Sequence, residues 1–338
     1  MGSLRDRIDA VYRSENRIQN MMIELTHVCP CDCEHCYLNR DPRDELFFAE
    51  WAGIFKQLAD EGTINLGLTG GEPMANKDFP RILEEISKYN FFVSILTTGV
   101  LIKQPEVDLL QRFGVQHAEV SLLGAGPATH DKIMRLTGAF ERMVNAVKLM
   151  RAAGMSIVLK ATVMKSNMAE LDEMKQLAAD LDCRFVSSVS VSTKDNGDRA
   201  PLDFALAQNE IAALDPIYVQ GGMLADDDFS DGAFLVCRAG STLGCISPRG
   251  DVYPCVLLPK SVGNLRQNSL HEIWHQDLDP MLVELRNLKE EDSTECYSCE
   301  LRKYCRRCPG VAYMETGSIT AKAHGCCICA EGIRSAME

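Results

Sequence analysis

The sequence predicts an α/β fold: a partial, open-sided barrel of six β/α units, followed by a small, cysteine-rich domain that bound metal stabilises. Short apolar runs alternate with segments of helical periodicity from residue 21 to about residue 191. Such alternation indicates a parallel sheet, because parallel strands need crossover connections. Fifteen cysteines, most of them after residue 236, indicate the second domain. Six units are too few to close an eight-stranded barrel, so we expect an open side.

The six expected strands are each followed by one expected helix, except the last. The strands cover residues 22–25, 64–69, 91–96, 115–122, 157–163 and 185–191. The helices cover residues 50–60, 79–89, 106–113, 141–153 and 169–181.

This alternation stops after residue 191. Residues 195–198 and 226–228 are typical of loops, and a helix is expected between them, at 205–218. After Cys237 the chain is rich in turns and cysteines, so we expect it to bury little apolar surface and to need metal for stability. The expected division is an N-terminal extension (1–19), the barrel (20–191), a linker with a helix (192–236) and the cysteine-rich domain (237–338).

Composition and charge exclude several classes of protein. The formal net charge of −13 argues against a nucleic-acid partner. No run of about 18 apolar residues predicts a membrane span, and the polar first 20 residues do not resemble a signal peptide. We therefore expect a cytoplasmic protein, and in that reducing compartment so many cysteines indicate metal binding or catalysis rather than disulfides.

Cys29, Cys33 and Cys36 form a C-x3-C-x2-C motif directly after the first expected strand. A four-iron cluster needs four ligands, so three thiolates leave one iron open to chelate a small molecule. Tyr37 follows the last cysteine, where its ring can pack beside an adenine.

Two alternatives accompany this interpretation. Cys31 lies between the ligands, too close for one regular cubane, and is expected to be a bystander. A zinc site would want a fourth ligand, and His27 or His35 is available for it.

Gly70, Gly71, Glu72 and Pro73 follow the second expected strand. Glycines let the backbone approach a ligand closely, and carbonyls at a strand end can accept hydrogen bonds from a ligand ammonium. Alone, this tetrapeptide indicates only a turn. Its place beside the three-cysteine loop indicates a binding site, because ligands bind at the carboxyl ends of parallel strands.

With both motifs, residues 20–191 resemble the radical S-adenosylmethionine (SAM) superfamily. The resemblance implies that the three cysteines hold a [4Fe–4S] cluster whose fourth iron binds SAM. It also implies that the Gly-Gly-Glu-Pro motif contacts the methionyl amine. Reductive cleavage of SAM then yields methionine and a 5′-deoxyadenosyl radical, which abstracts a hydrogen from the substrate.

Four further residues are expected near SAM. Thr98 and Ser121 stand at the ends of the third and fourth expected strands, where their hydroxyls can reach SAM. Arg135 can pair with the SAM carboxylate, and Lys160 can face the barrel interior. Each has an alternative as a helix cap, a turn residue or a solvated charge.

Ten cysteines follow residue 236, whereas two four-iron clusters need eight thiolates. In isolation, the spacing of Cys296 to Cys308 also suits a zinc ribbon. Beside a radical SAM region, the stretch resembles the SPASM domain, an auxiliary-cluster extension of peptide- and protein-modifying radical SAM enzymes. The resemblance implies a first auxiliary [4Fe–4S] cluster on Cys237, Cys245, Cys255 and Cys308. It implies a second on Cys296, Cys299, Cys305 and one of Cys326, Cys327 and Cys329, of which Cys327 is our choice.

The sequence departs from the SPASM pattern in one spacing. Two residues, not three, separate Cys305 from Cys308, so the assignment of Cys308 is open. In sulfatase-maturating members, an acidic residue after the Gly-x4-Cys cysteine is a proposed base. Val256 stands there in this chain, so we do not expect oxidation to formylglycine.

We expect oxidative modification of a peptide or protein by a crosslink, a thioether, epimerisation or oxidation. A substrate radical must lose an electron to become a closed-shell product, and an auxiliary cluster can accept it. The alternatives are oxidative decarboxylation of a tetrapyrrole side chain, action on another small molecule such as a sugar, or a non-enzymatic iron–sulfur or zinc protein.

The expected partners follow from this chemistry. Only about 20 residues precede the first expected strand, too few for the leader-peptide-binding segment of many such maturases. We therefore expect either a separate peptide-recognition protein or a substrate that is not a peptide. Reduction also requires an electron donor such as flavodoxin or ferredoxin. The sequence does not identify the substrate, the bond formed or the catalytic residue.

Overall fold

The computed structural model describes residues 4–215, 218 and 237–338. The loop expected at 226–228 and part of the helix expected at 205–218 therefore lie outside the described residues. Within that second range the structure has a short helix, α8 (Gln208–Ala212), preceded by a 3-10 turn, η3 (Ala200–Phe204).

A single curved sheet forms the centre of the described structure, with the strand order β6-β5-β4-β3-β2-β1-β7-β8-β9. The six expected strands are present, and all pair in parallel. Their bounds are β1 (Asn20–Glu24), β2 (Asn65–Thr69), β3 (Phe92–Thr97), β4 (His117–Ser121), β5 (Ser156–Thr162) and β6 (Arg184–Ser188). The prediction of a partial barrel with a parallel sheet is thus confirmed.

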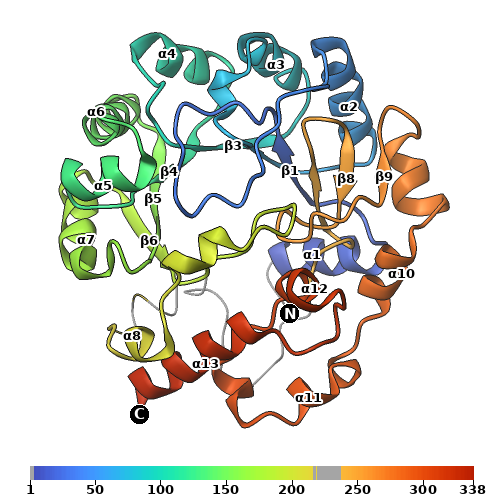
Figure 1. The fold of residues 1–338 in the computed structure, drawn as a ribbon. Helices are drawn as coiled ribbons and strands as arrows, with labels where there is room; N and C mark the ends of the chain where they lie inside the picture. The colour runs from blue at the N-terminus through green and yellow to red at the C-terminus, as the bar shows by residue number, and fades with distance from the viewer. Residues whose placement is uncertain (1–3, 216–217, 219–236) are drawn as a thin grey trace.

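Helices cover the outer side of this sheet (Figure 1). They are α2 (Phe48–Asp60), α3 (Phe79–Ile86), α4 (Gln104–Arg112), α5 (Pro127–Met134), α6 (Ala139–Ala152) and α7 (Leu171–Asp180), with short 3-10 turns η1 (Pro73–Ala75) and η2 (Met168–Glu170). All but α5 correspond to expected helices. In α3 the buried residues Phe79, Ile82, Leu83 and Ile86 repeat with helical spacing, which explains why the sequence predicts it.

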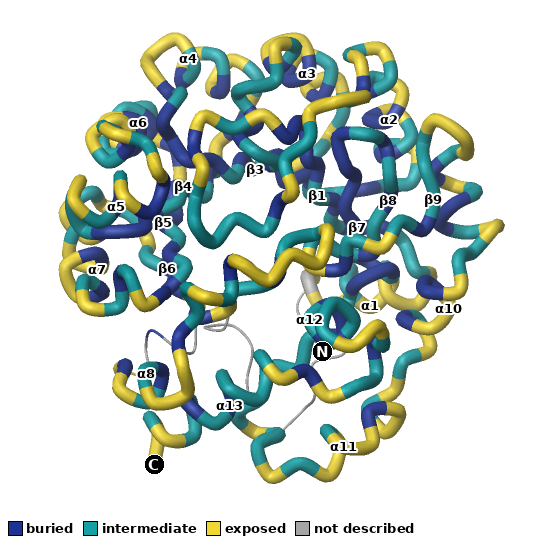
Figure 2. Tube along the Cα trace, in the orientation of Figure 1, coloured by how far each residue is buried: buried dark blue, intermediate teal, exposed yellow. Residues whose placement is uncertain are grey.

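The two sides of the sheet differ in burial. In β4, Ala118 and Val120 are fully buried against the helices, whereas His117, Glu119 and Ser121 are half-buried on the other side. Figure 2 shows the strands mostly buried and the outer surfaces of the helices exposed. The loop that follows β1 lies on the concave side of the sheet (Figure 1). The side chains on that side of the sheet therefore face this loop.

The sheet continues beyond the six expected strands. β7 (Leu243–Ile246) pairs in parallel with β1, so that Met22 lies opposite Cys245. β8 (Asp251–Tyr253) and β9 (Gly263–Asn264) then add antiparallel strands. The barrel and the cysteine-rich segment therefore share one sheet.

The remaining described elements flank this extension. They are α1 (Leu4–Ser14), the π-helix η5 (Glu272–Gln276), α10 (Pro280–Asn287), η6 (Glu290–Asp292), α11 (Thr294–Tyr297), η7 (Glu300–Tyr304), α12 (Pro309–Thr316) and α13 (His324–Met337). The N-terminal segment joins the barrel to the later chain, because Gln19 donates its N–H to the Thr242 carbonyl at 3.0 Å.

The expectation of little apolar burial after Cys237 is wrong for residues 243–285. Leu270, Trp274 and Leu282 are fully buried in the same core as the barrel residues. The Trp274 indole also donates a hydrogen bond to the Asn16 carbonyl at 2.9 Å. These short elements can bury apolar side chains without long periodic segments, because they pack against apolar side chains of the barrel.

No helix among the described residues is long and apolar enough to cross a membrane.

Candidate active site

The cysteine loop after β1 borders a cavity of about 510 Å³. Cys29, Cys33 and Cys36 line it. Cys31 does not: its side chain is 2% exposed, and its Sγ lies 3.8 Å from the Met134 Sδ. The neighbouring Cys31 thiol, followed by burial, raises the pKa of Cys29. Three of the four thiols in this loop therefore line the cavity, and the fourth, that of Cys31, is buried away from it.

Helix α5 fixes the cysteine loop from outside. Asp32 donates its N–H to the Met134 carbonyl at 3.0 Å, and Glu34 does so to the Ile133 carbonyl at 3.2 Å. Two guanidinium groups, those of Arg40 and Arg135, pair with the Asp32 carboxylate; the Arg135 contact is 3.2 Å. Arg135, expected to meet the SAM carboxylate, thus lines the cavity while its charge faces Asp32.

The Gly-Gly-Glu-Pro turn lies against the backbone that leads into the cysteine loop. Gly71 donates its N–H to the Thr26 carbonyl at 2.7 Å, and Glu72 donates to the Val28 carbonyl at 2.9 Å. A Cβ on Gly70 would lie 2.4 Å from the Thr26 carbonyl oxygen, and one on Gly71 would lie 2.4 Å from that of Val28. Gly70 also has a φ of +124°, which other residues rarely adopt. Both glycines are therefore required by close backbone approach.

Glu72 is fully buried and connects two strand ends. Its carboxylate accepts hydrogen bonds from Thr97 Oγ1 at 2.7 Å, from the Thr98 N–H at 2.8 Å and from Thr98 Oγ1 at 2.5 Å. Burial raises the pKa of Glu72, and these hydrogen bonds oppose the shift. The Thr98 hydroxyl, expected to reach SAM, is thus bonded to Glu72. Pro73, also buried, begins the turn η1 that follows.

Three other expected contacts lie in or near the barrel. Ser121 is the last residue of β4 and lies opposite Lys160 of β5. The Lys160 ammonium forms an ion pair with Glu119 at 2.8 Å, on the same side of the sheet as Ser121. The Tyr37 hydroxyl donates to the buried carboxyl of Glu24 at 2.9 Å, so it points toward β1.

The first C-terminal thiol group gathers around the sheet extension. Cys245 lies inside β7 and is fully buried, Cys255 follows β8, and Cys308 precedes α12. Burial, then the neighbouring Cys308 and Cys237, raises the pKa of Cys255 to about 12. Burial also raises the pKa of Cys245, with Glu24 and Cys255 as lesser causes. Cys255 thus neighbours the other three thiols of this group, so the four are placed to share one metal cluster.

The second thiol group borders one small cavity. Cys296, Cys299, Cys305 and Cys327 all line it, together with Arg302 and Lys322. Of the three adjacent cysteines in α13, Cys327 alone lines this cavity. Cys326 lies between the two groups, because burial raises its pKa to about 12 with Cys308 of the first group and Cys305 of the second as lesser causes.

The cysteine sets fit the clusters that the resemblance implies. Three thiols at the large cavity leave one iron position unligated, and each C-terminal group offers four sulfur ligands. The zinc alternative for the first site is less well supported by the same residues. His27 lines the cavity, but its Nδ1 lies 3.0 Å from the Asp41 carbonyl oxygen, and His35 does not line the cavity.

Several cavity residues were not identified from the sequence. Arg40, Asn39, Lys194 and Phe204 also line the cavity beside the cysteines. Asp195 connects its segment to the cysteine loop, because its N–H donates to the Tyr37 carbonyl at 2.8 Å. A sequence separation of more than 150 residues left no local signal for this contact.

Comparisons with known proteins agree with this arrangement. Residues 23–178 match the radical SAM superfamily, and residues 237–309 match SPASM, an iron–sulfur cluster-binding domain. The chain is 28% identical over 324 residues to a PqqA peptide cyclase of Rhizobium meliloti, covering 89% of this chain and 85% of that protein. It is 29% identical over 325 residues to an AdoMet-dependent heme synthase of Methanosarcina barkeri, covering 87% of this chain and 92% of that protein.

Solved structures share the fold. Streptococcus suis SuiB bound to S-adenosylmethionine superposes with a TM-score of 0.68 at 19% identity, covering 95% of this chain and 80% of SuiB. SuiB bound to its precursor peptide SuiA gives the same TM-score and identity, and that superposition covers 95% of this chain and 79% of SuiB.

Proposed function

We propose that this chain, which belongs to the radical SAM superfamily and carries a C-terminal SPASM domain, oxidatively modifies a peptide or protein substrate. The observation that carries the proposal is the similarity to PqqA peptide cyclases across most of both chains. The reaction forms a crosslink or thioether, or epimerises or oxidises a residue.

The residues present fit three iron–sulfur clusters. Cys29, Cys33 and Cys36 would hold the cluster that binds SAM. The first C-terminal group (Cys237, Cys245, Cys255 and Cys308) and the second (Cys296, Cys299, Cys305 and Cys327) would hold the auxiliary clusters. When bound, the clusters and SAM supply the 5′-deoxyadenosyl radical and a nearby acceptor for the electron that an oxidised product gives up. Residues 20–191 thus generate the radical, and residues 237–338 serve the oxidation.

The chain's own residues position these groups. Glu72 ties the Gly-Gly-Glu-Pro turn to the end of β3, and that turn is hydrogen-bonded to the backbone just before Cys29. Arg40, Arg135 and Lys194 line the cavity beside Asp32 and Glu34. Arg40 and Arg135 share Asp32 as their ion-pair partner, so two cations face one carboxylate there and can also attract a SAM carboxylate. Phe204 and Leu38 contribute apolar walls that exclude water from a reactive radical.

The proposal includes two external partners. A one-electron donor such as flavodoxin or ferredoxin supplies the electron for SAM cleavage, and a separate recognition protein presents the peptide. Deoxyadenosine release with such a donor in place of dithionite tests the first. A pull-down with the substrate peptide, with and without the candidate recognition protein, tests the second.

A second function is favoured by one specific observation. The heme synthase relative is as similar in sequence as the peptide cyclases and is matched over nearly its full length. The alternative substrate is therefore a tetrapyrrole whose side chain loses carbon dioxide.

One anaerobic experiment separates these functions. The protein, loaded with about twelve irons for three four-iron clusters, is given SAM and reductant with either short peptides encoded near its gene or a siroheme-type tetrapyrrole. Mass spectrometry then detects loss of hydrogen from a peptide or loss of carbon dioxide from the tetrapyrrole. Chiral amino-acid analysis of the hydrolysed peptide detects epimerisation, which leaves the mass unchanged, and deoxyadenosine is measured in each reaction. Turnover of the tetrapyrrole alone would overturn the peptide proposal. Full cluster content without deoxyadenosine in either reaction would overturn both.

A further inference from the structure

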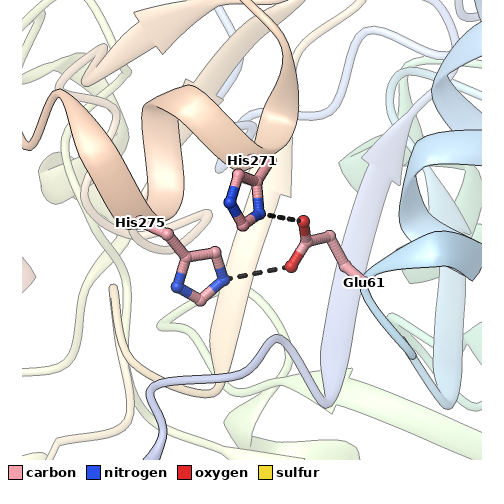
Figure 3. A group of neighbouring side chains, drawn as sticks. All are labelled: Glu61, His271 and His275. Carbon is pink, nitrogen blue, oxygen red and sulfur yellow. Dashed lines mark hydrogen bonds and ion pairs between the residues drawn. The ribbon is translucent and has the colours of Figure 1, made fainter.

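Two histidines and a glutamate, none of them lining the cavities that the cysteines border, converge at one place (Figure 3). His271 Nδ1 lies 2.8 Å from one carboxylate oxygen of Glu61, and His275 Nε2 lies 3.0 Å from the other. All three potential ligand atoms lie within 4.8 Å of one another. Two imidazole nitrogens and a carboxylate oxygen form a ligand set that zinc commonly takes in proteins.

The position of Glu61 separates this group from the cavity. Glu61 follows the end of α2 and precedes β2, so it lies near the amino end of a parallel strand. Cys29 follows the carboxyl end of β1. In a parallel sheet these ends lie at opposite edges, so the Glu61 group lies away from the cysteine loop that follows β1.

The local structure holds the three side chains in place. His271 and His275 are four residues apart on the turn that contains the π-helix η5. Both rings therefore project from the same side of that helical turn. π-Helices are rare and occur frequently at functional sites. Leu270 donates its N–H to the Gln57 side chain at 2.7 Å, which ties this turn to α2 one helical turn before Glu61. The buried Trp274, bonded to the Asn16 carbonyl, fixes the turn from its other side.

We propose that Glu61, His271 and His275 bind a zinc ion that joins helix α2 of the barrel to the π-helix of the C-terminal segment. Tetrahedral zinc with bonds of about 2.0 Å places neighbouring ligand atoms about 3.3 Å apart. His271 Nδ1 and His275 Nε2 lie 2.8 and 3.0 Å from different oxygens of the Glu61 carboxylate. One ligand atom from each residue lies within 4.8 Å of the others, so modest side-chain rotations bring the three onto one ion.

Exposure and protonation are compatible with such an ion. The carboxylate side chain is 14% exposed and the His275 side chain 22%, whereas His271 is 56% exposed. Water can therefore enter from the His271 side and fill the fourth position. In zinc binding, the ring nitrogens that face Glu61 coordinate the ion through their lone pairs, and each ring carries its hydrogen on its other nitrogen.

Zinc content and zinc ligation test this site in the intact, cluster-loaded protein. The natural protein and the His271→Ala/His275→Ala double variant are dialysed equally against buffered zinc and compared at equal iron content. We expect the natural protein to retain one more zinc ion per chain than the double variant. His117→Ala, which removes a half-buried histidine at the start of β4, should retain the zinc. Added zinc should raise the Tm of the natural protein and leave that of the double variant unchanged. Equal zinc in the natural protein and the double variant would overturn the proposal.

X-ray absorption at the zinc edge decides the question even where the double variant does not fold. A shell of nitrogen and oxygen at about 2.0 Å supports the site, whereas sulfur at about 2.3 Å assigns the zinc to cysteines and overturns it. The readouts do not depend on SAM cleavage, so failure of this site and failure of the proposed function are distinguishable.

Discussion

Thr98 donates both its backbone N–H and its hydroxyl to one carboxylate oxygen of Glu72, at 2.8 and 2.5 Å. Both residues are buried, and they join the end of β3 to the turn that follows β2. The geometry of the Gly-Gly-Glu-Pro turn therefore depends on an adjacent strand.

Thr98→Val removes the hydroxyl donor and leaves the buried carboxylate with fewer partners. We expect the free energy of unfolding to fall by about 1.5–3 kcal/mol, the range for a hydrogen bond to a charged group. Thr98→Ser retains the donor and should cost less than half as much. Anaerobic urea denaturation measures both variants; equal destabilisation would show that the hydroxyl bond contributes little.

Gly71→Ala places a methyl group 2.4 Å from the Val28 carbonyl oxygen and must displace the turn. We expect SAM binding about tenfold weaker, equivalent to about 1.4 kcal/mol, with the iron content unchanged. Gly53→Ala is the matched control, because nothing lies within 4 Å of its added Cβ. Calorimetric titration with SAM compares the two, and unaltered affinity in Gly71→Ala would refute a role for this turn in SAM binding.

Cys327→Ala should lose one auxiliary cluster, or about four of about twelve irons per chain. Cys326→Ala and Cys329→Ala should retain all three clusters, because neither side chain lines the cavity bordered by Cys296, Cys299 and Cys305. Iron and sulfide analysis after anaerobic reconstitution distinguishes the variants. Loss of iron in Cys326→Ala alone would move the fourth ligand to that residue.

Cys31→Ala should retain deoxyadenosine release, whereas Cys33→Ala should abolish it, because only Cys33 lines the large cavity. Both are assayed with SAM and dithionite after reconstitution. Equal loss of activity in the two variants would make Cys31 part of the cluster site.

His130 makes stability depend on pH. Burial lowers its pKa to about 4. Its Nδ1 accepts a hydrogen bond from the Leu123 N–H at 3.2 Å, and its Nε2 has no hydrogen-bond partner in the described part of the chain. The unfolded chain takes up a proton near pH 6.5, whereas the folded protein does not until about pH 4, so stability falls as the pH drops through this window.

Between pH 7.5 and 5.5 this histidine should cost about 1.4 kcal/mol of unfolding free energy. His130→Asn keeps an acceptor for the Leu123 N–H but cannot take up the proton, so its stability should fall by about that much less over the same range. Urea denaturation at both pH values measures the difference. Parallel pH dependence in the two proteins would refute the assignment.

The six-stranded half of the fold was predictable because each strand and helix has its own local pattern. Helix α5 was missed, since its eight residues carry little amphipathic signal. Strands β7, β8 and β9 are two to four residues long, too short for a readable alternation. β7 pairs with β1, which is far away in the sequence, and β8 and β9 add to β7 in turn. No local sequence pattern predicts this long-range pairing.

The cysteine sets were predictable as sets, but their surroundings were not. Spacing and resemblance indicated Cys29, Cys33 and Cys36, while the turn of α13 decides which of its thiols reaches the small cavity. The contact of Glu72 with Thr98 and the pairing of Arg135 with Asp32 arise from tertiary packing. Residues expected to touch SAM directly therefore turned out to have protein partners.

The pairing of β1 with β7 has a consequence for biosynthesis. During translation β1 is made first, but the strand that covers its second edge emerges only after the whole six-stranded half has left the ribosome. Until then the nascent chain presents an open strand edge, which invites mispairing with other chains. Because Cys245 lies within β7, the step that closes this edge also delivers a thiol of the first auxiliary group. Assembly of that group therefore ends later than the pairing of β7, because Cys255 and Cys308 follow this strand in the chain.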